Sequence, residues 1–141
     1  MSVLPNFTDI SENLSFLDDW EDRYRYLIEL GQTLPALDDA EKTADNKVSG
    51  CVSQVWLVAD KSDSGEGPVL NFRGDSDAMI VKGLVAVLIS LYSGRLARDI
   101  ARIDALAELD ALGLREHLTT QRSNGLAAMV ERMRAEGAAA A

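Results

Sequence analysis

Cys51 is the only cysteine among the 141 residues, and it is the strongest nucleophile that the chain carries. It lies in the segment Val48-Ser-Gly-Cys-Val-Ser-Gln54, between a Ser-Gly pair and the start of an apolar run. Gly50 lacks a Cβ, so the backbone can turn sharply beside the thiol. A thiol at a junction of loop and strand is easier to present to a partner than one in mid-strand. A free cysteine is more often a small buried hydrophobe, so its position makes Cys51 a candidate and no more.

The residues that accompany Cys51 limit its chemistry. His117 is the only histidine, so a Cys–His nucleophile would have to use it. A disulfide reductase needs Cys-x-x-Cys, a cluster scaffold needs several thiolates, and one Cys with one His makes a poor metal site. A single thiolate can still attack the outer sulfur of a donor persulfide, as in thiol–disulfide exchange, and carry that sulfur to an acceptor.

Two other interpretations of the same cysteine stay open. The first is a single-cysteine thiol enzyme, a peroxidase or hydrolase, which predicts turnover without a partner and a thiol exposed at rest. The second is a non-catalytic adaptor, in which Cys51 is structural and the acidic surface docks a partner.

Composition excludes some classes of partner. The formal net charge is −9 and the sequence pI is about 4.5, so phosphate backbones and anionic lipid surfaces repel the chain. We therefore expect neither nucleic acid nor membrane as the main partner, and the basic segment from Arg122 to Arg134 is more simply a solvated helix face. The longest apolar run, Leu84 to Leu91, is far shorter than the roughly 20 residues that span a bilayer. Without the pattern of a signal peptide, we expect a cytoplasmic protein.

Periodicity predicts the elements that must position Cys51. The length suits one domain over residues 1–141, and 47% of the residues are apolar. Two strands, Val52–Ala59 and Val69–Arg73, are expected to pair as an antiparallel hairpin around a loop from Lys61 to Pro68. Helical spacing predicts helices over Ser15–Leu34, over Ser76–Ser93 with Ser76 as N-cap, over one or two short stretches ending at Gly113, and over Arg122–Ala135. Residues 137–141 are expected to fray.

This order of elements predicts an α+β domain, a small antiparallel β-sheet with helices packed on one face. The turn Gly74-Asp-Ser-Asp77 is interpreted as a turn followed by a helix cap. No second domain or linker is expected.

Five segments, in order, resemble the SufE family of sulfur acceptors. The likeness extends from about Trp20 to Met133. Its segments are Trp20-Glu-Asp-Arg-Tyr-Arg-Tyr-Leu-Ile-Glu-Leu-Gly31, Val48-Ser-Gly-Cys-Val-Ser-Gln-Val-Trp56, Gly74-Asp-Ser-Asp-Ala78, Val81-Lys-Gly-Leu84, and Leu118 with Arg122-Ser-Asn-Gly-Leu126.

The resemblance implies a function and a partner. It implies that Cys51 takes persulfide sulfur from a SufS-type cysteine desulfurase, stimulates that enzyme, and delivers sulfur to a downstream iron–sulfur scaffold complex. The pyridoxal phosphate cofactor belongs to the desulfurase, so neither cofactor nor metal is expected in this chain. The role is that of an accessory sulfurtransferase without turnover of its own. The family fold is shared with IscU-type scaffolds, but the scaffold cysteines are missing here.

A working hypothesis assigns supporting roles around Cys51. At rest an apolar pocket, lined by Val52, Val55 or Leu84, would shelter the sulfur, and the loop from Ser49 to Ser53 would swing out when the desulfurase docks. Arg122 or Lys47 would stabilise the thiolate. The expected loop and supporting residues are Ser49, Gly50, Ser53, Gln54, Asp77, Arg122 and Asn124, with Gln54, Asp77 and Asn124 bracing the loop.

Overall fold

The computed structural model describes residues 4–51 and 53–141. Along the chain the elements are α1 (Phe7–Ser15), α2 (Trp20–Gln32), the 3-10 turn η1 (Asp39–Glu41), β1 (Val55–Asp63), β2 (Pro68–Ser76), α3 (Met79–Tyr92), β3 (Arg95–Leu96), α4 (Ala97–Ile100), α5 (Ala105–Ala111), the 3-10 turn η2 (Arg115–His117) and α6 (Thr120–Ala140).

The predicted hairpin is confirmed and is longer than expected. β1 and β2 pair antiparallel, from Val55 opposite Ser76 to Asp63 opposite Pro68. The expected loop over Lys61–Pro68 is therefore wrong for half of its length, and only residues 64–67 turn the chain. The polar end of β1 is exposed on both sides, so it carries no alternation of apolar residues. The two-residue strand β3, which pairs with β2, is too short to leave a periodic signal.

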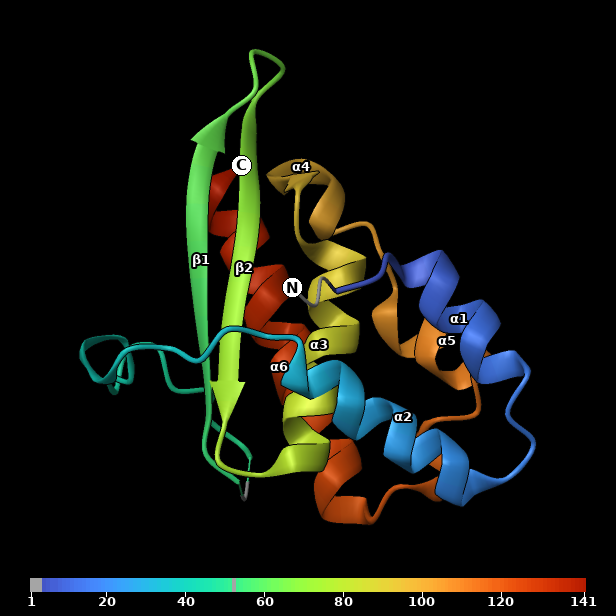
Figure 1. Cartoon of the computed structure of the whole chain (residues 1–141). Helices are drawn as coiled ribbons and strands as arrows, with labels where there is room; N and C mark the ends of the chain where they lie inside the picture. The colour runs from blue at the N-terminus through green and yellow to red at the C-terminus, as the bar shows by residue number, and fades with distance from the viewer. Residues whose placement is uncertain (1–3, 52) are drawn as a thin grey trace.

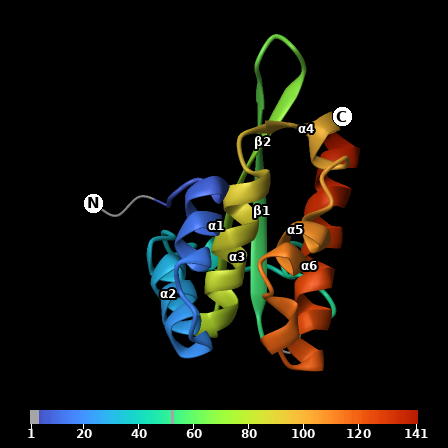
Figure 2. The same ribbon diagram turned by 90° about the vertical axis from the view of Figure 1, so that its right-hand side faces the viewer.

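The helices cover one face of this sheet, as predicted. Figures 1 and 2 show α1 and α2, then α3, then α5 and α6 arranged side by side across the hairpin. α3 lies in the middle of this layer, and eleven of its fourteen residues are buried. Helix α2 packs closely on α3 at Gly31. A Cβ on Gly31 would stand only 2.8 Å from the backbone nitrogen of Gly83, so this contact requires glycine.

The N-terminal region differs from the expectation of one helix over Ser15–Leu34. The structure has two helices there. The Asn6 side chain caps α1 by accepting a hydrogen bond from the Asp9 amide at 2.8 Å, and Asp19 caps α2 in the same way. α1 was missed because it buries only Ile10 and Leu14 in an otherwise polar segment.

The last helix is also longer than expected. Thr119 caps it, and Leu126, Met129, Val130 and Met133 are buried at helical spacing. Instead of fraying over 137–141, α6 continues to Ala140. Gly137 is buried, and its missing Cβ, which would lie 2.9 Å from Ile100 Cγ2, lets α6 approach α4.

Candidate functional site

Cys51 lies in a short loop that is closed at its base. Val48 donates its amide hydrogen to the Val55 carbonyl at 2.8 Å, and Leu57 donates to Asn46 at 2.9 Å. These bonds hold the chain on both sides of residues 49–54. Val52, which the sequence analysis placed in the sheltering pocket, lies outside the described residues. Any motion of the Cys51 loop is thus limited to about six residues by the backbone bonds at its base.

The loop rests on the first half of α6. Gly50 has φ of +91°, a conformation that L side chains rarely adopt, and a Cβ there would stand 3.2 Å from Ala128 Cβ. Gly125 faces the cysteine, and a Cβ on it would meet Cys51 Sγ at 3.5 Å. The thiol donates a weak hydrogen bond to the Gly125 carbonyl at 3.5 Å. Two residues without side chains thus let the loop and the helix come together around the sulfur.

Cys51 lines two hollows. The first, the Cys51 cavity, has a volume of about 260 Å³. It lies between the loop, α3 and the start of α6, and its walls are Cys51, Ser53, Val81, Leu84, Thr119, Gln121, Arg122, Gly125 and Met129. The second, the outer hollow, measures about 370 Å³ and is lined by Ala44, Lys47, Val48, Ser49, Gly50 and Cys51.

The two candidate cations fall on different sides of the cysteine. Arg122 lines the Cys51 cavity, whereas Lys47 lines the outer hollow. The thiol itself is half-buried, and this burial raises the pKa of Cys51 above the usual value for a thiol. A raised pKa keeps the group protonated at neutral pH and makes it a slow nucleophile in the resting conformation.

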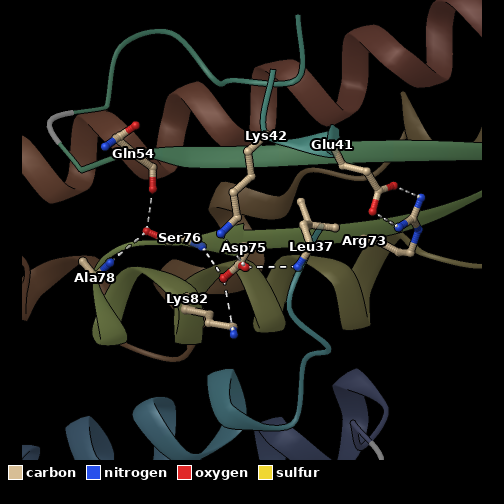
Figure 3. A network of polar contacts seen from close by, with 9 residues as sticks. All are labelled: Leu37, Glu41, Lys42, Gln54, Arg73, Asp75, Ser76, Ala78 and Lys82. Carbon is tan, nitrogen blue, oxygen red and sulfur yellow. Dashed lines mark hydrogen bonds and ion pairs between the residues drawn. The ribbon is translucent and has the colours of Figure 1, made fainter. Parts of the chain in front are cut away.

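Gln54 and Asp77 meet at the end of the loop. The Gln54 backbone amide donates to Asp77 Oδ1 at 3.0 Å. The Gln54 backbone carbonyl accepts from the Ser76 hydroxyl at 2.7 Å, as Figure 3 shows. Gln54 is therefore held through its backbone. The Ser76 hydroxyl also accepts from the Ala78 amide. The prediction of Ser76 as N-cap is wrong, because Ser76 is the last residue of β2 and Ala78 is the N-cap of α3.

The remaining predicted site residues divide between the site and the surface. Ser53 lines the cavity together with Leu84, whereas Ser49 is exposed beside the outer hollow. Val55 is buried in the core at the base of the loop. Asn124 is exposed on α6 and is not among the described residues that line either hollow.

His117 is occupied elsewhere. Its ring stacks on that of Trp20, with 4.4 Å between the centroids and 20° between the planes. Of the described residues that line the two hollows, none is a histidine. The arrangement gives no support to a Cys–His pair at Cys51.

Asp75 is a supporting residue that the sequence analysis missed. It is 6% exposed, and its carboxylate accepts hydrogen bonds from the amides of Leu37 at 3.1 Å and Ser76 at 2.8 Å (Figure 3). Lys82 lies 3.3 Å away and Lys42 lies 3.8 Å away. Burial alone would raise the pKa of Asp75, but the two amides and Lys82 outweigh it and lower this pKa below its usual value.

The Asp75 contacts join three parts of the chain. They connect the segment that leads to Cys51, the end of β2 and the first turn of α3. The sequence signal was present in Gly74-Asp-Ser-Asp77, but it indicated only a turn.

Comparison with known proteins identifies the family. Residues 8–137 match the model of SufE, described as an Fe-S metabolism associated domain. The chain belongs to the SufE family. As a SufE-family protein it has a role in iron–sulfur metabolism, and its resemblance to that family is confirmed.

Similar proteins agree with this assignment. An uncharacterized SufE-like protein of Rhizobium etli is 52% identical over 133 residues, 94% of this chain and 90% of the relative. One from Rhizobium meliloti is 49% identical over 133 residues, 94% and 95% of the two chains. A solution structure of a hypothetical protein from Thermus thermophilus aligns with a TM-score of 0.75 at 21% identity, covering 99% of this chain and 98% of that one. This last likeness shows a shared fold.

Two further findings concern the described residues alone. Within residues 4–51 and 53–141, no group of three or more His, Cys, Asp and Glu side chains is placed to hold a metal ion. None of the described helices combines the length and the apolar character needed to cross a membrane.

Proposed function

We propose that this SufE-family protein accepts sulfur on Cys51 from a cysteine desulfurase, stimulates that enzyme, and hands the sulfur on for iron–sulfur cluster assembly in the cytoplasm. One observation carries the proposal. The single thiol lies on a short loop with a fixed base, and it lines both the Cys51 cavity and the outer hollow. A thiol in this place can be sheltered at rest and presented when a partner docks.

The transfer needs no group beyond the two sulfur-bearing cysteines. The Cys51 thiolate attacks the outer sulfur of the persulfide on the desulfurase, and a new S–S bond forms at Cys51. The S–S bond of the donor breaks in the same step, and the donor cysteine leaves as a thiolate. Delivery repeats the exchange: an acceptor thiolate takes the outer sulfur, and Cys51 leaves as a thiolate. No net oxidation occurs, and the pyridoxal phosphate that first releases sulfur belongs to the desulfurase.

Docking would activate the thiol by moving it. In the resting conformation burial raises the pKa of Cys51 and slows its reactions. When residues 49–54 leave α6, the sulfur enters water and its pKa returns toward the ordinary value, so the nucleophile forms where the donor is. On return, the Cys51 cavity shields the persulfide from stray thiols.

The rival thiol enzyme fits the same site less well. A peroxidase or hydrolase needs a thiolate that is available at rest, usually beside a base. Cys51 instead has a raised pKa, and the only histidine stacks on Trp20.

The experiment is a sulfur-transfer assay read by intact mass spectrometry. The protein is incubated with a SufS-type desulfurase and free cysteine, and we expect a mass gain of one sulfur atom that a reducing agent removes. Cys51→Ser should gain no sulfur and should leave the desulfurase unstimulated, measured as alanine formed. Sulfur on the Cys51→Ser variant, or full stimulation by it, would refute the carrier role, and full stimulation alone would favour the adaptor.

A further inference from the structure

Arg122 is a half-buried cation that lacks an acidic partner among the described residues. It is the one charged side chain that they contribute to the wall of the Cys51 cavity. None of the ion pairs within residues 4–51 and 53–141 includes it. A guanidinium has five N–H donors, and a partly desolvated one is stabilised by an anion within reach.

Tyr24 makes the side-chain contact that fixes this guanidinium. Arg122 Nη1 donates a hydrogen bond to the Tyr24 hydroxyl at 3.3 Å, across 98 positions of sequence. The tyrosine lies in α2 and is half-buried against the core. A neutral hydroxyl can orient the guanidinium without neutralising its charge, which a carboxylate would do.

Helix α2 holds the surrounding wall as well. Arg23, beside Tyr24, donates from Nη1 to the Leu112 carbonyl at 3.1 Å, and Trp20 stacks on His117. Both contacts tie the segment before α6 to α2, which is itself packed on α3. The first turns of α2 therefore contact and support the part of the chain that carries Arg122.

We infer that Tyr24 is a positioning residue, which holds the Arg122 guanidinium on the cavity wall so that the Cys51 cavity favours a negatively charged group attached to the sulfur. In the proposed function, on which this role rests, that group is the ionised outer sulfur of the persulfide. It extends one S–S bond, about 2 Å, beyond Sγ.

Alkylation tests this inference without any sulfur transfer. Iodoacetate and iodoacetamide have nearly the same shape and react with the same thiolate, but only iodoacetate places a negative charge beyond the sulfur. The selectivity to measure is the ratio of two folding equilibrium constants from urea unfolding, that of the protein carboxymethylated at Cys51 divided by that of the same variant carbamidomethylated there. It compares the two adducts after the loop has closed, so the reactivity of the thiol does not enter, and a net charge of −9 would by itself push it below one.

We expect a selectivity of roughly threefold in favour of the carboxymethylated native protein, because the positive charge of Arg122 lies on the wall of the same partly desolvated cavity as Cys51. Tyr24→Phe, which removes only the hydroxyl, should lower it about twofold, and Arg122→Gln should abolish it. Tyr26→Phe is the matched control, since the Tyr26 hydroxyl accepts from Asn13 at 2.9 Å, away from the site. That variant should keep the native selectivity.

Three results would overturn the role of Tyr24. They are a native selectivity at or below one, a selectivity that is unchanged in Tyr24→Phe, or a selectivity that is lost in Lys47→Met and kept in Arg122→Gln. The outcome is separate from that of the transfer assay. Charge selectivity that depends on Tyr24, in a protein that gains no sulfur, would refute the proposed function and leave the positioning role intact.

Discussion

The Cys51 side chain is weakly held at rest by the described residues. Among them, the one hydrogen bond to its sulfur is the weak S–H donation to the Gly125 carbonyl at 3.5 Å. Close packing of Gly50 on Ala128 and of Cys51 on Gly125 adds to this bond. Such a loop keeps its resting place by shape, because two glycines remove the side chains that would separate it from α6. A small change in backbone strain should therefore shift the balance between the resting and the open loop.

Gly50→Ala should accelerate the reaction of Cys51. An alanine at φ of +91° costs about 1 kcal/mol in the left-handed region, and its Cβ would also press on Ala128. If the open loop relaxes that strain, the open population and the iodoacetamide rate rise about fivefold.

Gly65→Ala is the matched control for that change. Gly65 has nearly the same φ, +86°, but it lies at the tip of the hairpin with open space around it. It should lose stability without any change in the alkylation rate. An equal rate in Gly50→Ala and the native protein would mean that strain at Gly50 does not limit exposure of the thiol.

Site residues that lie close together in the sequence could be predicted from it. The positions of residues that meet only in the folded structure could not. The Ser-Gly-Cys segment pointed to Cys51 because nucleophile and flexible backbone are adjacent. Arg122 and Lys47 were equal candidates as cations, and only the fold assigns them to different hollows. Asn124 was expected to brace the loop. It lies two residues after Arg122 in the same helix, so it is on a different face, and it is exposed. Tyr24 carried no signal, since its partner is 98 residues away.

Between elements, the buried carboxylate of Asp75 is a connecting group. Its carboxylate joins the segment before Cys51, β2 and α3, and it is buried with hydrogen bonds from two amides. Asp75→Asn keeps the shape but removes the charge that Lys82 and the amides favour. We expect a loss of about 2 kcal/mol at neutral pH, measured by urea unfolding.

The effect of Asp75→Asn should depend on pH in a defined direction. The pKa of Asp75 is lowered in the folded protein, so its charge stabilises the fold above the pKa of the unfolded chain, near 4. That stabilisation disappears as the pH falls through the folded pKa, and the two proteins should converge in acid. Asp110→Asn, in an exposed pair with Arg115, is the control and should change stability little at any pH. A constant difference from neutral pH into acid would contradict this assignment.

The C-terminal end of α6 gives a second prediction about elements. Removal of residues 137–141 should lower stability by about 1 kcal/mol or more, because Gly137 is buried against α4 and Ala140 packs on the core. Removal of Ala141 alone, which is exposed, should have no effect on the unfolding temperature. Equal unfolding temperatures for the five-residue deletion and the full chain would show that the tail is frayed after all.

The elements themselves were predicted where burial imposes a period. α3 is buried over most of its surface and α6 over one face, so both carry apolar residues at helical spacing. The far ends of β1 and α6 were not predicted, because neither carries a periodic apolar pattern. The outer half of β1 is exposed and polar, and the Ala-rich end of α6 lacks an amphipathic pattern even though Gly137 makes a close contact.

At the scale of the whole molecule, the architecture follows from the order of its elements. A hairpin followed by helices of strong periodicity leaves one sheet face to be covered, which sequence can indicate. The site, in contrast, forms where the loop before β1 meets α3 and the start of α6. These parts are separated by up to about half of the chain, and only their packing creates the cavity. A single sequence therefore specifies the nucleophile and the fold more readily than the walls around the nucleophile.

Opening of this molecule at Cys51 should be local. The backbone bonds of Val48 and Leu57 close the base of the loop, and a single well-packed core lies behind it. Moving residues 49–54 exposes little surface, whereas unfolding exposes the core, and the dependence of a free energy on urea scales with the surface exposed. The iodoacetamide rate at Cys51 should thus be nearly independent of urea at low concentrations and rise steeply only near the unfolding midpoint. A rate that follows the slope of global unfolding from the lowest concentrations would mean that the thiol is reached only when the whole domain unfolds, and a carrier that works by opening its loop would be impossible.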